Sequence, residues 1–211
     1  MYTPFGLYWN GMWQKPASGK SIPVISPVTE EVLGEAPAAN KSDTRKVVES
    51  AVSGTAQWRK VIAWERSRML RRVAEVMRER TDDMARWLSL ELGKPLDQSK
   101  GEVGMAIEQF EWYAEEAKRI YGHVLESRQP HGKVLIQHEP LGVVAAFTSW
   151  NFPVVLAARK IAPALAAGCS VILRPAEEAP GSAMLLVQCL HEAGVPAGVI
   201  NLINGSANTI S

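Results

Sequence analysis

The sequence has almost no net charge and no long apolar run. Its 23 lysines and arginines balance 22 acidic residues, which leaves a net charge of +1. No broad positive field attracts nucleic acid or an anionic membrane, so partners must be argued from local sites. No apolar run approaches the roughly 18 residues of a membrane span, and residues 1–14 lack the basic start and apolar core of a signal peptide. We expect a cytoplasmic protein that binds neither nucleic acid nor membrane.

Cysteine is scarce, and the common ligand-binding spacings are missing. Cys169 and Cys189 make no disulfide framework in a chain of 211 residues. Cys169 lies between a helix-ending glycine and an apolar run, and Cys189 lies among leucines, so both are predicted to be small core residues rather than nucleophiles. No CxxC or HExxH spacing occurs, which predicts no metal site. GxGxxG is also absent, so spacing alone does not indicate a dinucleotide site.

The chain is organised around residues 141–175. Gly142 to Thr148 is an apolar run without polar alternation, which predicts a parallel strand covered on both faces. Pro153 starts a helix over Val154 to Ala167, and Gly168 ends it. Ser170 to Leu173 is a second apolar run. The pattern predicts a βαβ unit, whose ligands bind outside the carboxyl ends of the strands.

The remaining segments predict helices before the βαβ unit and a further helix and strand after it. Asn10-Gly11 between aromatic residues predicts a hairpin, and the prolines within 22–28 predict an edge strand. Gly54 weakens the first predicted helix. The fold class is α/β, with an N-terminal helical layer and a parallel-sheet core. The predicted helices are Ser42–Trp58, one or two helices over Trp64–Leu92, Leu96–Ile120 and Pro180–Ala193, and the last strand is Val199–Ile203.

Residues 122–140 predict a two-stranded ribbon, because two alternating runs flank Gln129-Pro130-His131-Gly132. An isolated ribbon is barely stable in water, so it should be covered by other polypeptide. Packing against its own domain is an open alternative. The chain then divides into residues 1–121 with the first strands and helices, the ribbon at 122–140, and the βαβαβ core at 141–211.

Five blocks together resemble the aldehyde dehydrogenase superfamily, and within it the succinate-semialdehyde dehydrogenase-like branch. They are ELGKPL at 91–96, FEWYAEEAKRIYG at 110–122, SWNFP at 149–153, ARKIAPALAAGCSVILRPAEEAP at 158–180 and AGVPAGVINLINGSA at 193–207. The resemblance implies a Rossmann-like dinucleotide-binding domain, with the ribbon as an oligomerisation arm of a dimer or tetramer. It also implies NAD(P)-dependent oxidation of an aldehyde, with a carboxylate-bearing semialdehyde favoured, to the acid through a cysteine thioester.

Asn151 is the candidate catalytic residue. It follows a strand end and precedes a helix N-terminus, where amide donors and the helix dipole stabilise a developing oxyanion. The resemblance implies that role, and the alternative is an N-cap for the helix at Pro153. Arg159 matches the arginine that grips the distal carboxylate of a semialdehyde in this branch, and a planar fork suits that task. Its alternative is a structural ion pair.

Cofactor residues are assigned through the resemblance. Glu177 would accept hydrogen bonds from ribose hydroxyls and repel a 2′-phosphate, which favours NAD over NADP. Arg174 stands where the family usually has lysine, and it argues slightly for NADP, which stays possible. A surface pair of Arg174 with Glu177 is the alternative. The implied cofactor-binding residues are Phe147, Thr148, Ser149 and Trp150 near nicotinamide, Arg174, Pro175, Ala176 and Glu177 near the ribose, and Gly205 and Ala207 near adenine.

The resemblance also implies that the cysteine nucleophile and glutamate base of the family belong to a C-terminal portion outside these 211 residues. We therefore expect an N-terminal portion without turnover of its own, because neither cysteine is placed to attack. A catalytically inactive nucleotide-binding or oligomerising module of the same fold is the alternative. An acyl-reductase relative that makes acyl-CoA also stays open, although Glu177 and Arg159 fit the dehydrogenase better.

Overall fold

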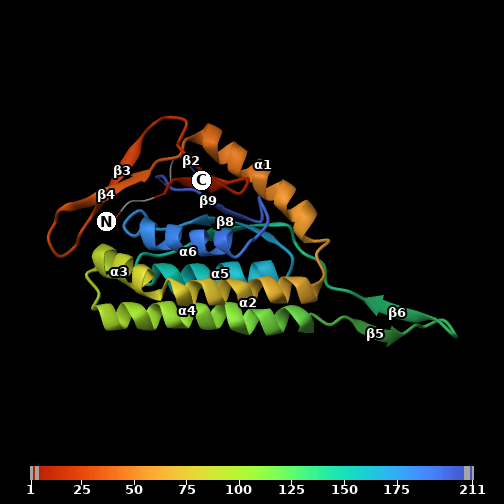
Figure 1. The fold of residues 1–211 in the computed structure, drawn as a ribbon. Helices are drawn as coiled ribbons and strands as arrows, with labels where there is room; N and C mark the ends of the chain where they lie inside the picture. Colours follow the sequence, from red (N-terminus) through yellow and green to blue (C-terminus); the bar gives the residue numbers. More distant parts are fainter. Residues whose placement is uncertain (1, 3–4, 207–209, 211) are drawn as a thin grey trace.

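A five-stranded sheet forms the centre of the molecule. The computed structural model describes residues 2, 5–206 and 210, and its main sheet has the order β2-β1-β9-β8-β7 (Figure 1). β7, β8 and β9 are parallel, as expected for the βαβ pattern. β1 joins β9 antiparallel, with Tyr8 opposite Leu202, so the sheet is mixed rather than parallel throughout. The strands are β1 (Leu7–Trp9), β2 (Met12–Gln14), β7 (Val143–Phe147), β8 (Ser170–Arg174) and β9 (Ile200–Leu202).

Helices cover both faces of this sheet. α1 lies on one face, α5 and α6 lie on the other, and α2, α3 and α4 form an outer layer over α5 and α6 (Figure 1). α5 and α6 are consequently apolar on nearly all sides. No helix in the described part is both long and apolar enough to cross a bilayer. The bounds are α1 (Lys41–Trp58), α2 (Ala63–Glu79), α3 (Thr81–Leu92), α4 (Leu96–Glu116), the 3₁₀ turn η1 (Ala117–Arg119), α5 (Pro153–Ala166) and α6 (Pro180–Glu192).

Two local predictions at the N-terminus meet different outcomes. The hairpin is confirmed, because Asn10 and Gly11 have φ angles of 50° and 75° and join β1 to β2. α1 begins at Lys41, one residue before the predicted start at Ser42, and its N-cap is Asn40. The side chain of Asn40 accepts hydrogen bonds from the backbone N–H groups of Ser42 (2.8 Å) and Asp43 (3.0 Å). The Asp43 carboxylate accepts from the backbone of Asn40 in return, which makes a capping box.

A second sheet contains a strand that the sequence did not indicate. β3 (Ser21–Ile25) pairs antiparallel with β4 (Val32–Pro37), and together they form a two-stranded sheet beside the main one. The edge character predicted for residues 22–28 is confirmed by this arrangement. β4 lacks a clear period-two pattern, because Gly34 and Pro37 interrupt its apolar residues.

The prediction that the first strand of the βαβ unit is covered on both faces is wrong. β7 is an edge strand of the main sheet, and its buried residue Ala146 faces α5 and the core. Val143 and Phe147 on the alternate positions are 37% and 57% exposed. An apolar run therefore indicated a strand correctly, but its second face is uncovered within the described chain.

The ribbon of residues 122–140 extends away from the body of the molecule (Figure 1). β5 (His123–Glu126) and β6 (Lys133–Ile136) pair antiparallel, and every residue of both strands is exposed. The alternative of packing against its own domain is therefore wrong. Cover by another chain remains a prediction.

Gly54 has a packing function that its sequence context did not reveal. α1 crosses the loop before β9 so closely that a Cβ atom at Gly54 would lie 2.1 Å from the carbonyl oxygen of Gly198. Gly198 itself has a φ angle of 80°, and a Cβ there would lie 2.5 Å from the carbonyl oxygen of Ser50. Both glycines are needed because two backbones approach each other here.

Substituting two helical glycines should give effects of opposite sign. Gly54→Ala should lower the free energy of unfolding by about 3 kcal/mol or more, because backbone must move to admit the methyl group. Gly101→Ala, in α4 with open space around it, should raise that free energy by about 0.5–1 kcal/mol through helix propensity. Urea denaturation followed by circular dichroism measures both. Equal effects at the two positions would contradict the packing argument.

Candidate active site

Three loops meet at the carboxyl edge of the parallel strands. The loops follow β7, β8 and β9, and backbone hydrogen bonds tie their starts together. The N–H of Thr148 donates to the carbonyl of Arg174 (3.2 Å), and the N–H of Ile203 donates to the carbonyl of Leu173 (2.9 Å). The predicted site residues after these strands therefore belong to one edge, which is where ligands of such sheets bind.

Arg174 joins two of these loops. Its Nη2 donates to Oε1 of Glu177 (2.6 Å) and to the carbonyl oxygen of Gly205 (3.0 Å). The Arg174 side chain is only 17% exposed, whereas that of Glu177 is 37% exposed. The Arg174–Glu177 ion pair that the sequence left as an alternative does form. The same Arg174 side chain also joins the loops after β8 and β9 through its hydrogen bond to Gly205. Oε2 of Glu177 has no partner among the described residues.

The other predicted cofactor residues differ in accessibility. Pro175 and Ala176 are buried, whereas Ser149 and Phe147 are exposed. Gly205 has a φ angle of 148°, and a Cβ there would lie 3.3 Å from the carbonyl oxygen of Ala39, so glycine suits this position. Ala207 lies outside the described residues.

A cavity of about 540 Å³ opens beside this edge. It is lined on one side by Trp150, Glu177 and Glu178 and on the other by α3 and the strand β3. Trp150 is 58% exposed and Glu177 is half-buried, so both reach the cavity from different strand ends. Asn151 does not line this cavity. The structure thus brings Trp150 and Glu177 together, and it places Asn151 on the exposed turn next to them.

Asn151 is not the N-cap of α5. The cap position is Phe152, and the first backbone donors of the helix go to a residue of the outer layer. The N–H groups of Val154 and Val155 donate to Oε1 of Glu102, at 3.0 and 3.3 Å. The side-chain amide of Asn151 makes no hydrogen bond within the described part of the chain, so its donors are available to a ligand.

Lys94 fixes the backbone of the Asn151 turn. Its Nζ lies 2.5 Å from Oε2 of Glu102, 3.4 Å from the carbonyl oxygen of Asn151 and 4.2 Å from the ring centroid of Phe152. The Lys94 side chain is 15% exposed and that of Glu102 is fully buried. The sequence analysis gave no role to Lys94 or Glu102. The ELGKPL block of the resemblance contains Lys94, whereas no sequence signal marked Glu102.

A second buried glutamate, Glu91, accepts hydrogen bonds from the first N–H groups of α6, as Glu102 does for α5. Glu91 accepts hydrogen bonds from the N–H groups of Gly181 (2.6 Å) and Ser182 (3.0 Å) and from the hydroxyl of Tyr2 (2.5 Å). Burial raises the pKa of Glu91, and burial together with the neighbouring carboxylate raises the pKa of Tyr2. The loop of residues 174–180, which carries Glu177, is thereby held at its far end.

Arg159 is a free cation on an otherwise buried helix. Apart from Arg159 and Lys160, α5 exposes little to solvent. Neither cation forms an ion pair or side-chain hydrogen bond within the described residues. The pairing with a glutamate or a helix end that was the alternative for Arg159 does not occur among the described residues, so its guanidinium is available to a carboxylate.

Both cysteines are free and buried, as expected for core residues. Burial raises the pKa of the Cys189 thiol to about 12, and its Sγ lies 4.0 Å from Sδ of Met84. A thiol of this kind holds almost no thiolate near neutral pH. Cys169 is buried beside the end of α5, away from the carboxyl edge.

Two buried polar atoms at the carboxyl edge have no hydrogen-bond partner in the described part of the chain. Oγ1 of Thr148 and Nδ2 of Asn204 are buried without a hydrogen-bond partner among the described groups. Such atoms are costly unless a ligand or water satisfies them. Thr148 follows β7 and Asn204 follows β9, on either side of the Arg174 loop. Both are therefore polar atoms at the carboxyl edge that the described chain leaves unsatisfied.

Removing the carboxylate of Glu102 tests its contacts with Lys94 and with the first N–H groups of α5. Glu102→Ala leaves the Lys94 charge and two helix N–H groups unsatisfied, so it should lower the free energy of unfolding by about 3–5 kcal/mol. Glu108→Ala, at an exposed position of the same helix, should change it by less than about 0.5 kcal/mol. Adding Lys94→Met to Glu102→Ala should restore part of the loss. Denaturant titration tests all three, and a small effect of Glu102→Ala would contradict the assignment.

The comparisons with known proteins agree with this geometry. Glutarate-semialdehyde dehydrogenase of Pseudomonas putida is 45% identical over 203 residues, which cover 96% of this chain and 42% of that protein. Succinate-semialdehyde dehydrogenase [NADP(+)] GabD of Escherichia coli is 42% identical and covers 95% of this chain and 42% of its own length. The crystal structure of succinate-semialdehyde dehydrogenase from Burkholderia pseudomallei has a TM-score of 0.94 at 40% identity, and it covers 97% of this chain and 42% of that one.

An NADP-dependent enzyme of E. coli has a TM-score of 0.96 at 40% identity, over 98% of this chain and 43% of that chain. The chain thus spans about 42% of the length of the relatives it matches. The model of the aldehyde dehydrogenase family matches residues 13–211. Together with the α/β fold and its carboxyl-edge loops, this match identifies the chain as a member of the aldehyde dehydrogenase family.

Proposed function

We propose that this chain forms the NAD-binding and oxyanion-stabilising part of an aldehyde dehydrogenase that oxidises a semialdehyde to the acid through a cysteine thioester. The observation that carries the proposal is the Arg174–Glu177–Gly205 cluster at the carboxyl edge. It joins two loops beside a cavity and leaves one oxygen of Glu177 unused. A carboxylate with a free oxygen at this position suits the ribose hydroxyls of a dinucleotide.

NAD is preferred over NADP in this proposal because of charge. A 2′-phosphate would approach the Glu177 carboxylate, and Arg174 is already paired with Glu177 and the Gly205 carbonyl. NADP remains the second candidate, since GabD of E. coli is named for NADP(+). Phe147, Thr148, Ser149 and Trp150 line the proposed nicotinamide side, and the unsatisfied Oγ1 of Thr148 supports this placement.

Asn151 and Arg159 take the substrate in this proposal. The free amide of Asn151, on a turn held by Lys94, would donate to the oxyanion that forms at the aldehyde carbon. Such a donor contributes about 3 kcal/mol to a transition state by comparison with other oxyanion donors. The unpaired guanidinium of Arg159 would bind the distal carboxylate, and two relatives are named as semialdehyde dehydrogenases.

The remaining parts of the proposal concern assembly and location. We assign residues 1–121 and 141–211 to cofactor binding and the projecting ribbon of 122–140 to a dimer or tetramer interface, which its complete exposure supports. The two free cysteines are consistent with a cytoplasmic location. An inactive nucleotide-binding module of the same fold is the second candidate function, and the buried state of both thiols favours it for these 211 residues by themselves.

Calorimetry with NAD and NADP tests the cofactor assignment directly. The purified chain should bind NAD more tightly than NADP. Glu177→Ser should lower the affinity for NAD by about tenfold, which is the loss expected for one hydrogen bond to a charged group. It should also reduce the ratio of the NAD affinity to the NADP affinity. Glu178→Ser, which changes the neighbouring carboxylate on the same cavity, should leave the ratio unchanged. Tight binding of NADP without binding of NAD would refute the role of Glu177.

A turnover assay tests the catalytic part. The purified 211-residue chain with succinate semialdehyde and NAD should produce no NADH above background. Burial raises the pKa of the Cys189 thiol to about 12, and Cys169 is buried beside the end of α5, away from the carboxyl edge, so neither supplies a nucleophile there. Absorbance at the NADH maximum measures this. Clear turnover that disappears in Cys169→Ala or Cys189→Ala would show that a thiol within the chain does attack.

A further inference from the structure

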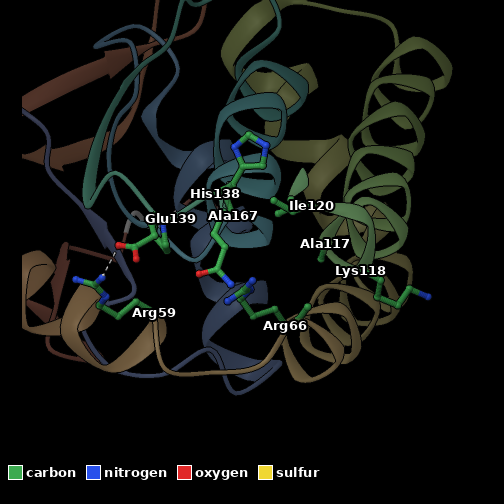
Figure 2. Close-up of a pocket in the computed structure, with 12 residues that line it drawn as sticks. Arg59, Arg66, Ala117, Lys118, Ile120, His138, Glu139 and Ala167 are labelled. Atoms are coloured by element: carbon green, nitrogen blue, oxygen red, sulfur yellow. Dashed lines mark hydrogen bonds and ion pairs between the residues drawn. The ribbon is translucent and has the colours of Figure 1, made fainter. Parts of the chain in front are cut away.

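A second cavity, of about 510 Å³, lies at the other end of the parallel strands (Figure 2). It opens between the α1–α2 connection, η1 and the segment that returns from the ribbon to β7. Its walls carry three cations and one carboxylate, and Ala167 closes it at the C-terminal end of α5. These charged residues are Arg59, Arg66, Lys118 and Glu139.

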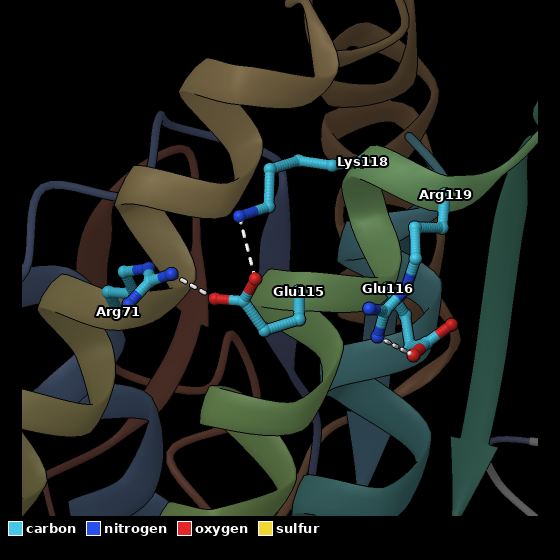
Figure 3. A network of polar contacts seen from close by, with 5 residues as sticks. All are labelled: Arg71, Glu115, Glu116, Lys118 and Arg119. Atoms are coloured by element: carbon cyan, nitrogen blue, oxygen red, sulfur yellow. Dashed lines mark hydrogen bonds and ion pairs between the residues drawn. The ribbon is translucent and has the colours of Figure 1, made fainter.

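Two of the three cations already have acidic partners. Arg59 lies 3.3 Å from Glu139, as the dashed line in Figure 2 shows. Lys118 lies 2.7 Å from Glu115, which also pairs with Arg71 of α2 (Figure 3). Glu139 neutralises Arg59, and Glu115 shares its single negative charge between Lys118 and Arg71. Arg66 is therefore the one cation of the cavity wall that contacts no carboxylate of the described residues.

Arg66 is a cation without an acidic partner in the described chain. Its Nη1 donates to the carbonyl oxygen of Val61 (2.7 Å), and its Nε is buried without any hydrogen-bond partner. Burial lowers the pKa of Arg66, which marks a guanidinium removed from water without full compensation. Gly168 leaves room for it, because a Cβ there would lie 3.1 Å from Nη1. The unsatisfied side of the guanidinium is therefore the edge formed by Nε and Nη2.

We propose that this cavity is a binding site for the carboxylate of a small organic acid, held side-on by Nε and Nη2 of Arg66. A carboxylate presents two oxygens to two parallel N–H groups, which is the geometry that an arginine edge offers. One negative charge matches Arg66, the cation of this cavity that has no acidic partner among the described residues. The volume is in the range of small-molecule sites. The site is separate from the carboxyl edge and does not depend on the function proposed there.

The Nε–H resonance of Arg66 tests the proposal. In ¹H–¹⁵N spectra of the isotope-labelled, unsubstituted protein, this resonance is assigned through its side-chain correlations to the backbone of Arg66. Titration with sodium acetate should shift it saturably downfield, whereas sodium chloride at the same ionic strength should not. Because this measurement uses the unsubstituted protein, it holds even where a variant fails to fold. No saturable shift, or an equal shift with chloride, would overturn the proposal.

Variants and a second ligand complete the test. Arg66→Lys should weaken acetate binding by about tenfold or more, because lysine cannot present two parallel donors. Arg68→Lys, on the same helix with an exposed arginine paired to Glu65, should bind acetate as the unsubstituted protein does. Unchanged affinity in Arg66→Lys would contradict the site. An acetylated peptide with a free C-terminus that bound more tightly than acetate would overturn the small-acid assignment in favour of a polypeptide end.

Discussion

Two buried glutamates hold the N-termini of the core helices, and the site geometry depends on them. α5 and α6 both begin with proline, and neither has a capping side chain of its own, since Phe152 and Ala179 occupy the cap positions. Their first N–H groups would otherwise be unsatisfied inside the protein. Glu102 from α4 and Glu91 from α3 accept them instead. The outer helical layer thus covers the core helices and also supplies the hydrogen-bond acceptors for their N-termini.

This arrangement explains how exposed loops at the carboxyl edge keep a defined geometry. The turn of Asn151 lies between the end of β7 and the start of α5, and Lys94 and Glu102 fix its second half. The loop of Glu177 lies between β8 and α6, and Glu91 fixes its far end while Arg174 fixes its near end. Each loop is therefore restrained on both sides although its functional side chain is accessible. Side chains that bind ligands gain most from such restraint, because less ordering remains to be done on binding.

The sequence predicted the features that depend on local pattern. Apolar runs, glycines and prolines located the βαβ unit and the hairpin at Asn10-Gly11 within a residue or two of their observed bounds. They placed the ribbon in residues 122–140, where its strands span 123–136. Pattern and resemblance together pointed to Asn151, and resemblance pointed to the roles of Arg174 and Glu177. The structure brings Arg174, Glu177 and Gly205 into one cluster.

What the sequence did not reveal depends on distant partners. Glu102 and Val154 are 52 residues apart, and Glu91 and Gly181 are 90 apart, so no periodicity could connect them. The sequence showed Gly54 only as a residue that weakens a helix. Its packing function depends on the backbone of Gly198, which is distant in the sequence. The apolar run of β7 predicted burial on two faces, since pattern describes a strand and not its neighbours.

The direction of the core helices gives the two ends of the sheet different electrostatic character. α5 and α6 start at the carboxyl edge, so the positive ends of both helix dipoles converge there, and the anions Glu91, Glu102 and Glu177 lie at that end. α5 finishes at the opposite end, where its free carbonyls are the negative pole and Arg66 is the nearby cation. A carboxylate at Arg66 would feel this negative pole as well as the guanidinium. Binding there must therefore come from the paired donors of Arg66 rather than from the general field, so geometry at this one side chain determines the affinity.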